Sequence, residues 1–222
     1  MKIPALRRSR SAGFTLVELI TVVSVIVLLF ALVAGAYTYA DKSSKRNRTE
    51  VSIRVIRSAL ENYREKFGAY PQPSNPSEAV AIADKSYIAG GAACLYQALS
   101  GDGFNQIEGA DGLGNPSSDG QVDVNEAANI TLTDMPKELW THNNSSLYYM
   151  VDGFGHPIRY IKAAPTQSPI PGQPPPQAVT INLTTYDIWS YGEDTENITS
   201  MGIDTQNDTT LASESSKWIK NW

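Results

Sequence analysis

Cysteine and histidine are scarce in this chain, which limits the chemistry it offers. Of its 222 residues, one is cysteine, Cys94, and two are histidines, His142 and His156. A single cysteine excludes an intrachain disulfide and a cysteine-based metal site. The histidines lie in turn-like segments, and the sequence contains no phosphate-binding loop, nucleophile elbow or histidine-pair metal motif. These absences argue against an enzyme, and Cys94, within Ala-Ala-Cys-Leu-Tyr, is predicted to be a buried apolar position.

Positive charge is also in short supply. The chain has 18 lysines and arginines against 23 aspartates and glutamates, for a formal net charge of −5. Residues 1–13 hold four of the cations and no acid, so the chain from residue 14 onward carries −9. An acidic chain without a basic patch argues against nucleic acid as a partner. The roughly 180 residues that follow the apolar N-terminal region are enough for one globular domain with its own core.

Long apolar runs are absent except for one near the N-terminus. Between Phe14 and Tyr39 the only charged residue is Glu18. A helix of ~20 apolar residues spans a bilayer, so residues 14–39 are predicted to be a transmembrane and assembly segment. The cations of residues 1–13 favour a cytoplasmic N-terminus. An acid inside a membrane helix is costly, and we therefore expect Glu18 to have a functional role.

The junction Gly13-Phe14-Thr15-Leu16-Val17-Glu18, between a short basic leader and the apolar run, resembles the class III signal of type IV pilins and type II secretion pseudopilins. The resemblance implies that a prepilin peptidase removes residues 1–13 by cutting after Gly13 and then methylates Phe14. It also implies that Glu18 acts with Phe14 in filament assembly.

Two other interpretations of the N-terminus are an ordinary secretory signal, cut near Ala34-Gly35-Ala36, and a plain membrane anchor. The first is at odds with the length of the apolar run and with Glu18. The second explains neither Glu18 nor the Gly-Phe junction.

The helical pattern continues beyond the apolar run. A single apolar stripe at helical spacing is formed by Ile53, Ile56, Leu60, Tyr63 and Phe67. Because no proline lies between Phe14 and Phe67, one continuous helix is predicted, with a break near residues 41–48 as the alternative. Gly68 and Pro71 are typical of a helix end. Residues 63–71 are similar to the stretch by which pseudopilins leave this helix.

Residues 71–145 form an insertion that the family resemblance does not cover well. Helices are predicted at residues 77–85 and 92–100, from their runs of alanine and larger apolar residues. A shift to glycine, aspartate, asparagine and serine then predicts a long loop at residues 101–129.

The remaining chain predicts β structure. Strands are predicted at residues 147–151, 158–162, 179–183 and 186–190. The prolines of residues 165–176 require an exposed connection, and residues 152–160 resemble the turn and first strand of the pseudopilin sheet. The predicted fold is therefore α+β and pilin-like, with a long N-terminal helix and a small antiparallel sheet packed on its C-terminal half. The globular domain is predicted to comprise residues 40–222.

A calcium site is one hypothesis for the long loop. Residues 115–126 follow the rhythm of a calcium-binding loop, in which Asp119, Asp123 and Glu126 would supply oxygen ligands around a tight turn at Gly120. The first ligand position is asparagine, the next is serine, and Pro116 lies between them. These departures favour the alternative, a polar surface loop.

A second calcium hypothesis concerns the C-terminal segment. Residues 186–194 resemble the major pseudopilin, in which the loop after this strand holds a structural calcium. The resemblance places Asp194 among the ligands, and Asp204 or Asp208 could complete the set of oxygen donors. Trp218 stands where the family has a further aspartate. The alternative is that these acids are solvated surface residues.

The resemblance as a whole implies a structural protein, closest to the major subunit of type II secretion pseudopili. Such a subunit is a single-pass inner-membrane protein with its C-terminal domain in the periplasm. Its partners are further copies of itself in a filament, minor pseudopilins, the prepilin peptidase and the inner-membrane assembly platform, and filament growth drives protein export. The alternatives are a subunit of a type IV or competence pilus and a membrane-anchored periplasmic binding protein.

Overall fold

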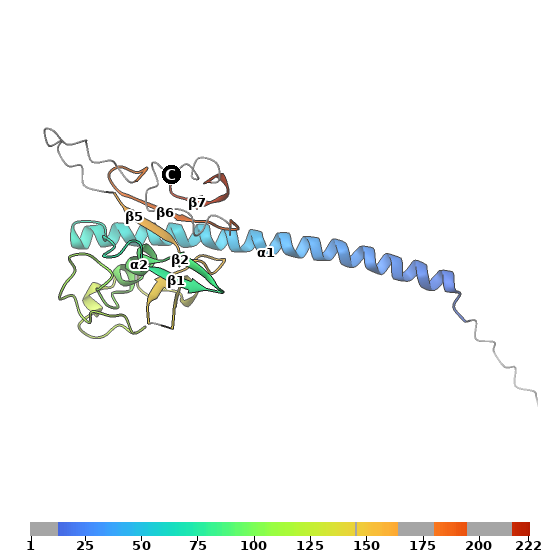
Figure 1. The fold of residues 1–222 in the computed structure, drawn as a ribbon, viewed down its shortest axis with the longest axis horizontal. Helices are drawn as coiled ribbons and strands as arrows, with labels where there is room; N and C mark the ends of the chain where they lie inside the picture. The colour runs from blue at the N-terminus through green and yellow to red at the C-terminus, as the bar shows by residue number, and fades with distance from the viewer. Residues whose placement is uncertain (1–12, 145, 164–179, 195–214) are drawn as a thin grey trace, which may run out of the picture. The chain divides into compact units, whose positions relative to one another are not determined.

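The computed structural model describes residues 13–144, 146–163, 180–194 and 215–222. By its internal contacts the chain forms two compact units, Met1–Lys42 and Ser43–Trp222. The described part is α+β, with a long N-terminal helix and small antiparallel sheets (Figure 1).

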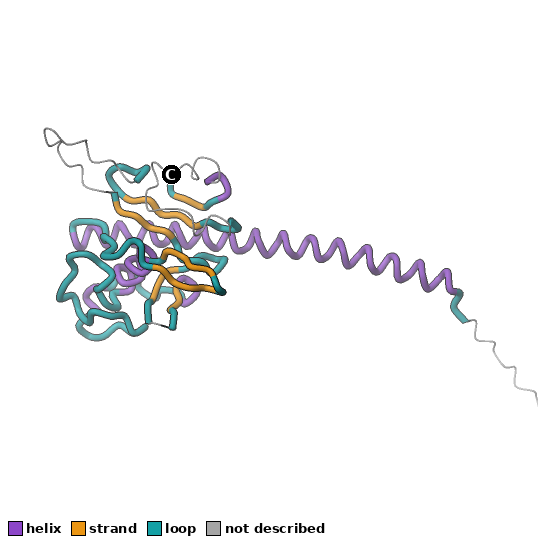
Figure 2. Tube along the Cα trace, viewed as in Figure 1, coloured by secondary structure: helices purple, strands orange, loops and turns teal. Residues whose placement is uncertain are grey.

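The secondary structure consists of two α-helices, three short 3-10 helices and seven short strands within the described residues. Irregular segments make up much of the rest of the second unit (Figure 2). The elements in chain order are α1 (Leu16–Phe67), β1 (Ala79–Ile82), β2 (Lys85–Ile88), α2 (Gly90–Ser100), η1 (Ala127–Asn129), η2 (Lys137–Leu139), β3 (Trp140–His142), β4 (Tyr148–Met150), β5 (Arg159–Lys162), β6 (Tyr186–Ser190), η3 (Ser215–Lys217) and β7 (Ile219–Lys220).

Helix α1 is a single element of 52 residues, as the absence of proline predicts, and the alternative of a break near residues 41–48 is wrong. It begins two residues after Phe14 and ends at Phe67. Gly68 follows with a φ of +82°, and its N–H donates to the carbonyl of Arg64 at 2.8 Å. This left-handed residue stops the helix where the sequence predicts, because glycine adopts positive φ without steric cost.

Four of the five residues of the predicted apolar stripe on α1 are buried in the second unit, and the fifth, Phe67, is half-buried. Ile56 and Leu60 are completely inaccessible to solvent, and Ile53 is 4% exposed. They share one core with residues of α2, β5 and β6, and Figure 1 shows β5 and β6 alongside this part of α1. Each fully buried side chain of this size contributes about 1.5–3 kcal/mol to folding. The stripe is therefore the main apolar attachment of the sheet and of α2 to this helix.

The predicted helix at residues 77–85 is wrong. The segment forms an antiparallel hairpin, in which β1 and β2 are joined through Ala83 and Asp84, both at positive φ. Val80 and Tyr87 face each other in the register, and both are buried, while their neighbours along each strand are more exposed. Over four residues, the run Ala-Val-Ala-Ile fits both the helical period and the strand period. The turn through Ala83 and Asp84, both at positive φ, is of the kind that joins the strands of a hairpin.

Helix α2 confirms the helix predicted at residues 92–100 and begins two residues earlier, at Gly90. At Gly90 and Gly91 the backbone of α2 lies too close to neighbouring backbone carbonyls to leave room for a side chain. A Cβ on Gly91 would lie 2.3 Å from the carbonyl oxygen of Tyr160, and one on Gly90 would lie 1.9 Å from that of Asn75. Cys94 is fully buried on this helix, as predicted, and burial raises the pKa of its thiol, which keeps it unreactive.

Three of the four predicted strands are confirmed, as β4, β5 and β6. They belong to different sheets, because β4 pairs with β3 whereas β5, β6 and β7 form a three-stranded antiparallel sheet. The strand predicted at residues 179–183 is wrong over its described part. Residues 180–183 form a turn in which the buried Asp187 carboxylate accepts the N–H groups of Ile181 and Asn182 at 2.7 and 3.0 Å. The proline-rich connection at 165–176 lies outside the described residues.

Candidate assembly segment and acidic loops

The start of α1 is closed by two residues that bond each other. The backbone N–H and the hydroxyl of Thr15 both donate to Oε2 of Glu18 at 2.9 Å, and the N–H of Glu18 donates to Oγ1 of Thr15 at 3.2 Å. This reciprocal arrangement is a capping box, which satisfies N–H groups that a helix start leaves without partners. The sequence interpretation missed this role, although the pattern Thr-x-x-Glu before an apolar run signals it.

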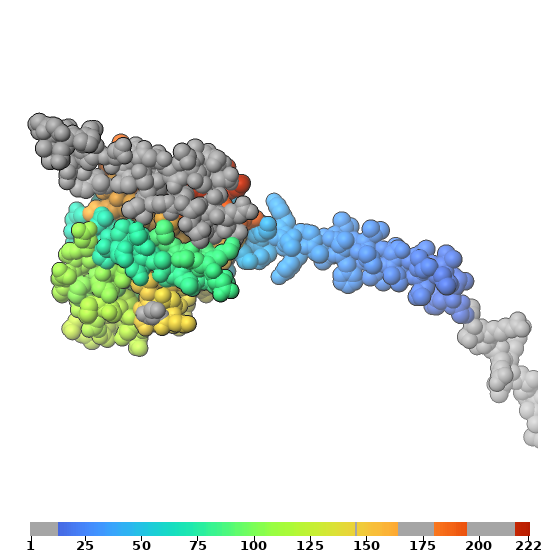
Figure 3. All heavy atoms as spheres, in the orientation of Figure 1, coloured from blue at the N-terminus to red at the C-terminus, as the bar shows by residue number. Residues whose placement is uncertain are grey.

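The apolar segment that follows is uncovered. In the first unit the side chains of this segment are exposed, from Phe14 at 85% to Tyr39 at 77%. Figure 3 shows them as a bare column along this part of α1. By length and composition α1 could cross a membrane, and no part of its apolar window is buried. An apolar surface of this extent needs either lipid or other apolar chains around it.

The predicted cleavage junction is accessible. Gly13 and Phe14 precede the first helical turn, both are exposed, and a Cβ on Gly13 would meet no atom within 4 Å. The bond between them therefore lies in exposed chain outside any helix or strand, the kind of segment in which proteolytic cleavage concentrates.

The buried carboxylate of Glu126 organises the long loop at residues 101–129. Glu126 is 1% exposed. Its Oε1 accepts N–H groups from Gly103 at 3.2 Å and Asn115 at 3.1 Å, and its Oε2 accepts the N–H of Asp123 at 3.0 Å. Both oxygens are therefore engaged by backbone donors, and the acid joins three parts of the loop.

The other two acids of this calcium hypothesis have separate partners. Asp123 accepts a bond from the side-chain amide of Asn115 at 2.7 Å, and Asp119 accepts the N–H of Gln121 at 2.8 Å. Within the described residues no three acidic, histidine or cysteine side chains gather closely enough to hold a metal ion. A cation at Glu126 would have to displace backbone N–H donors. Calcium in this loop stays a prediction.

A second buried carboxylate, which the sequence interpretation missed, lies at the end of α2. Asp102 is 1% exposed and accepts the hydroxyl of Tyr96 at 2.7 Å and the N–H groups of Asp119 and Gly120 at 3.1 and 2.9 Å. Burial raises the pKa of the Asp102 carboxyl, and these donated bonds oppose the rise. Asp102 and Glu126 thus each accept backbone N–H groups from the loop at residues 101–129.

Asp194, the first acid of the C-terminal calcium hypothesis, is hydrogen-bonded to Trp218. The indole Nε1 of Trp218 donates to Oδ2 of Asp194 at 2.9 Å. The indole ring is 3% exposed and packs edge-on against Tyr191 at 5.0 Å between ring centroids. Asp204 and Asp208, predicted as further calcium ligands, lie outside the described residues. Oδ2 of Asp194 therefore accepts an indole N–H, whereas the resemblance implies that the Asp194 carboxylate binds a metal ion.

The turn at residues 152–155 fastens the sheet to α1 in the second unit. The N–H of Gly153 donates to Oγ1 of Thr49 at 2.9 Å, and the Thr49 hydroxyl donates to the carbonyl of Lys45. A Cβ on Gly153 would lie 2.4 Å from that same carbonyl oxygen. Only glycine allows this approach, because any other residue would place its Cβ against that oxygen.

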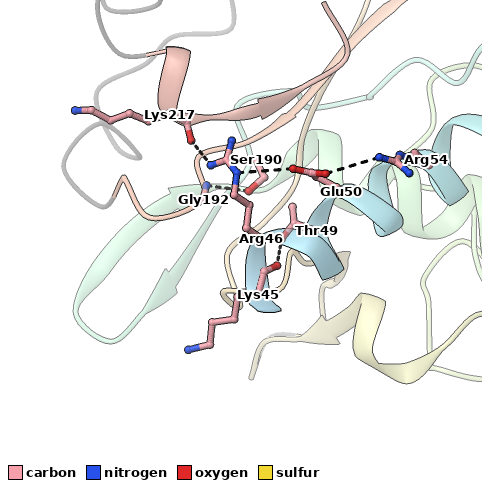
Figure 4. A network of polar contacts seen from close by, with 8 residues as sticks. All are labelled: Lys45, Arg46, Thr49, Glu50, Arg54, Ser190, Gly192 and Lys217. Atoms are coloured by element: carbon pink, nitrogen blue, oxygen red, sulfur yellow. Dashed lines mark hydrogen bonds and ion pairs between the residues drawn. The ribbon is translucent and has the colours of Figure 1, made fainter. Parts of the chain in front are cut away.

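Asp152, in the same turn, carries the connection onward to β6. Its carboxylate is buried and accepts the N–H groups of Phe154 and His156 and the hydroxyl of Ser190. The Ser190 hydroxyl in turn accepts the N–H of Gly192 at 2.9 Å (Figure 4). Burial raises the pKa of the Asp152 carboxyl, and the Ser190 bond opposes that rise.

A further contact joins α1 to the C-terminal segment. Nη1 of Arg46 donates to the carbonyl of Lys217 at 3.0 Å, one residue before Trp218 (Figure 4). Arg46 and Arg54 each lie 3.7 Å from the carboxylate of Glu50. All three side chains are partly solvated, so these ion pairs contribute little stability. The carbonyl bond of Arg46 therefore matters more for the position of the C-terminal segment.

Comparison with family models, with curated proteins and with solved structures gives no match. The functional conclusion therefore rests on the residues and contacts of this chain.

Proposed function

We propose that this chain is a structural subunit of a filament of the type IV pilin and type II secretion pseudopilin class, closest to the major pseudopilin. Subunits polymerise through α1, and growth of the filament drives protein export. The fold of the second unit is then pilin-like, and the loop at residues 101–129 is an addition to it. The chain acts as a structural element rather than as an enzyme.

One observation carries this proposal. The Gly13-Phe14 junction opens the apolar segment at residues 14–39, whose large apolar side chains are exposed and whose only acid, Glu18, lies in the first turn of α1. A membrane anchor needs the apolar surface alone, whereas a filament subunit also needs a free N-terminus and an acid near it. The accessible junction supplies the first, and Glu18 supplies the second.

Glu18 has two functions in this proposal. Within one chain it completes the capping box with Thr15. After cleavage the new ammonium of Phe14 lies four residues before it, and both charges are costly in hydrocarbon. In a stagger of parallel helices, Glu18 of one subunit meets the Phe14 ammonium of the next. That contact removes both penalties and sets the axial register.

The proposal also assigns a location and partners. The precursor lies in the inner membrane with residues 1–13 in the cytoplasm, in accord with their cations. The second unit lies in the periplasm. A prepilin peptidase processes the chain, an assembly platform extracts it from the membrane, and minor pseudopilins join the same filament.

The test is the N-terminus of the mature protein. Mass spectrometry of the chain expressed together with a prepilin peptidase should find N-methylated Phe14 as the first residue. The catalytically inactive peptidase is the control and should leave Met1 or Lys2 at the N-terminus. A mature chain beginning at Tyr37, as a secretory signal predicts, would refute the proposal.

A further inference from the structure

A cluster of cations follows the apolar segment at residues 14–39 within the same helix. Residues 42–48 contain four lysines and arginines, which we call the basic collar: Lys42, Lys45, Arg46 and Arg48. Four cations against the one acid Asp41 give residues 41–49 a net charge of +3. This is a local exception in an acidic chain, and the filament proposal assigns no partner to it.

The apolar segment ends in a pair of tyrosines. Tyr37 and Tyr39 are 73% and 77% exposed. Tyrosine is enriched at membrane–water interfaces, where its amphipathic ring lies at the level of the headgroups. A polar headgroup layer about 5–7 Å thick covers each face of the hydrocarbon. In a membrane-spanning α1, the two tyrosines are therefore expected at the level of this layer.

The basic collar begins directly beyond these tyrosines. At about 1.5 Å per residue along α1, Lys42 lies ~5 Å and Lys45 ~9 Å past Tyr39. Lysine and arginine have long side chains that turn back toward the headgroups from such positions. Arg48 lies farther out, ~14 Å past Tyr39. Lys42 and Lys45 are thus the two collar residues that lie nearest to the level of the lipid phosphates.

The collar surrounds part of the helix instead of converging on one point. At about 100° per residue, its four positions spread over about 160° of the helix circumference. Lys42 is exposed and Lys45 is half-buried, and Figure 4 shows the side chains of Lys45 and Arg46 extending from α1 in different directions. Cations separated in this way suit several small anions around the helix better than one ligand in a pocket. Lipid phosphates are such anions, and lysine and arginine bind phosphate by charge-assisted hydrogen bonds.

We propose that the basic collar binds the phosphate headgroups of anionic phospholipids. Each cation near an anionic membrane surface favours such binding by about fivefold. In the cleaved chain of the proposed function, the collar holds the only cations beside the apolar segment, because the other four belong to residues 1–13. The inference rests on the membrane span of that proposal, but it needs neither cleavage nor polymerisation.

A second copy of this chain is the competing partner of the collar. The chain from residue 14 onward carries −9, so its residues outside 41–49 carry −9 − 3 = −12 and could attract the collar of a neighbour. The position directly after Tyr39 favours lipid instead. Headgroups surround a membrane helix at this level whether or not it is assembled, whereas an acidic neighbour is present only in a filament.

Native mass spectrometry of the full-length chain in a neutral detergent tests this inference. The probes are phosphatidylglycerol and phosphatidylcholine with the same acyl chains, added in equal amounts. We expect the natural chain to retain at least about fivefold more phosphatidylglycerol than phosphatidylcholine. The Lys42→Gln/Lys45→Gln variant should lower that ratio about fivefold or more. It leaves Arg46 in its bond to the carbonyl of Lys217.

The measurement is made on the precursor and on the chain expressed with a prepilin peptidase. The cations of residues 1–13 also attract anionic lipid, so the expected result is the same relative fall in both samples. That fall is independent of whether cleavage occurs. Failure of the collar and failure of the filament proposal are therefore distinguishable.

The matched control is Lys85→Gln/Lys137→Gln, which removes two exposed lysines outside α1 and should leave the lipid ratio unchanged. Equal retention of both lipids by the natural chain, or an equal fall in both double variants, would overturn the inference. Displacement of phosphatidylglycerol by excess inorganic phosphate would assign the collar to free phosphate. Loss of a homodimer in Lys42→Gln/Lys45→Gln at an unchanged lipid ratio would assign it to a second copy.

Discussion

The indole Nε1 of Trp218 donates a 2.9 Å hydrogen bond to the carboxylate of Asp194, across a sequence separation of 24 residues. Together with the bond from Arg46 to the carbonyl of Lys217, it fixes the C-terminal segment at two adjacent residues. The C-terminus is therefore positioned by hydrogen-bond donors as well as by burial of the Trp218 ring.

We expect the Trp218–Asp194 pair to be coupled in stability. Trp218→Phe keeps an aromatic ring but removes the donor, and Asp194→Ala removes the acceptor. A double-mutant cycle on the full-length chain in detergent, followed by denaturant unfolding, should give a coupling free energy of about 1 kcal/mol. Trp222→Phe, in the same aromatic cluster, is the matched control and should show no coupling to Asp194→Ala. If the changes in unfolding free energy caused by Trp218→Phe and Asp194→Ala simply add, the hydrogen bond between these residues does not contribute to stability.

The same variants decide the calcium prediction for Asp194. If calcium binds there, it raises the melting midpoint by mass action, because it binds only the folded state. We expect a higher midpoint in millimolar calcium than in chelator for the natural chain, and no such difference for Asp194→Ala. An identical midpoint in calcium and in chelator for the natural chain would contradict a calcium site at Asp194.

The two functions proposed for Glu18 are separable by substitution. Glu18→Gln retains an oxygen that can complete the capping box but removes the charge, whereas Thr15→Ala breaks the box and keeps the charge. We expect Glu18→Gln and Glu18→Ala to be processed and inserted but to form no filaments by electron microscopy. Thr15→Ala should still form them, with a cost to the helix start of about 1 kcal/mol. Filaments from Glu18→Gln and none from Thr15→Ala would show that the cap alone matters.

Asp152 makes stability depend on pH in a stated direction. Burial raises the pKa of its carboxyl above its ordinary value of 3.8, so the folded state binds this proton more tightly than the unfolded state does. The stability that this tighter proton binding contributes is fully present below pH 3.8, and it is lost as the pH rises through the raised pKa of Asp152 in the folded state. The free energy of unfolding of the natural chain should therefore fall as the pH rises above the ordinary carboxyl value of 3.8.

The Asp152→Asn variant should lose this dependence. Ser190 can still bond the asparagine, since its hydroxyl accepts as well as donates. Asp111→Asn, at an exposed site, is the control and should retain the slope of the natural chain. A slope in Asp152→Asn equal to that of the natural chain would assign the pH dependence to other groups, such as Asp102, whose carboxyl pKa is also raised by burial.

Much of the helical and strand structure could be predicted from local pattern. The stripe through Ile56 and Leu60 and the glycine after Phe67 define where α1 packs and where it ends. These features depend on the helical period and on residues adjacent in the chain, so one sequence is enough to find them. The capping box of Thr15 and Glu18 is equally local, because its two residues are three positions apart in the chain.

The hairpin at β1 and β2 shows where local pattern fails. Over four residues, an apolar run fits both the helical and the strand period. The segment forms a hairpin because the chain turns through Ala83 and Asp84, both at positive φ. Neither is glycine, so the turn carries little sequence signal. The division of the strands into separate sheets is likewise invisible locally, because pairing joins residues far apart in the chain.

The sequence by itself determined the long helix and its apolar and buried faces, since each follows from neighbouring residues, and it predicts the cleavage junction at Gly13 and Phe14 on the same local basis. Only the tertiary structure decided what the buried acids do. Besides bonds from nearby residues, Asp102, Glu126 and Asp152 each accept a hydrogen bond from a residue far along the chain, from Gly120, Gly103 and Ser190 respectively. A carboxylate has several acceptor positions and little preference among donors, so its partner is set by whichever donors the folded chain brings to it.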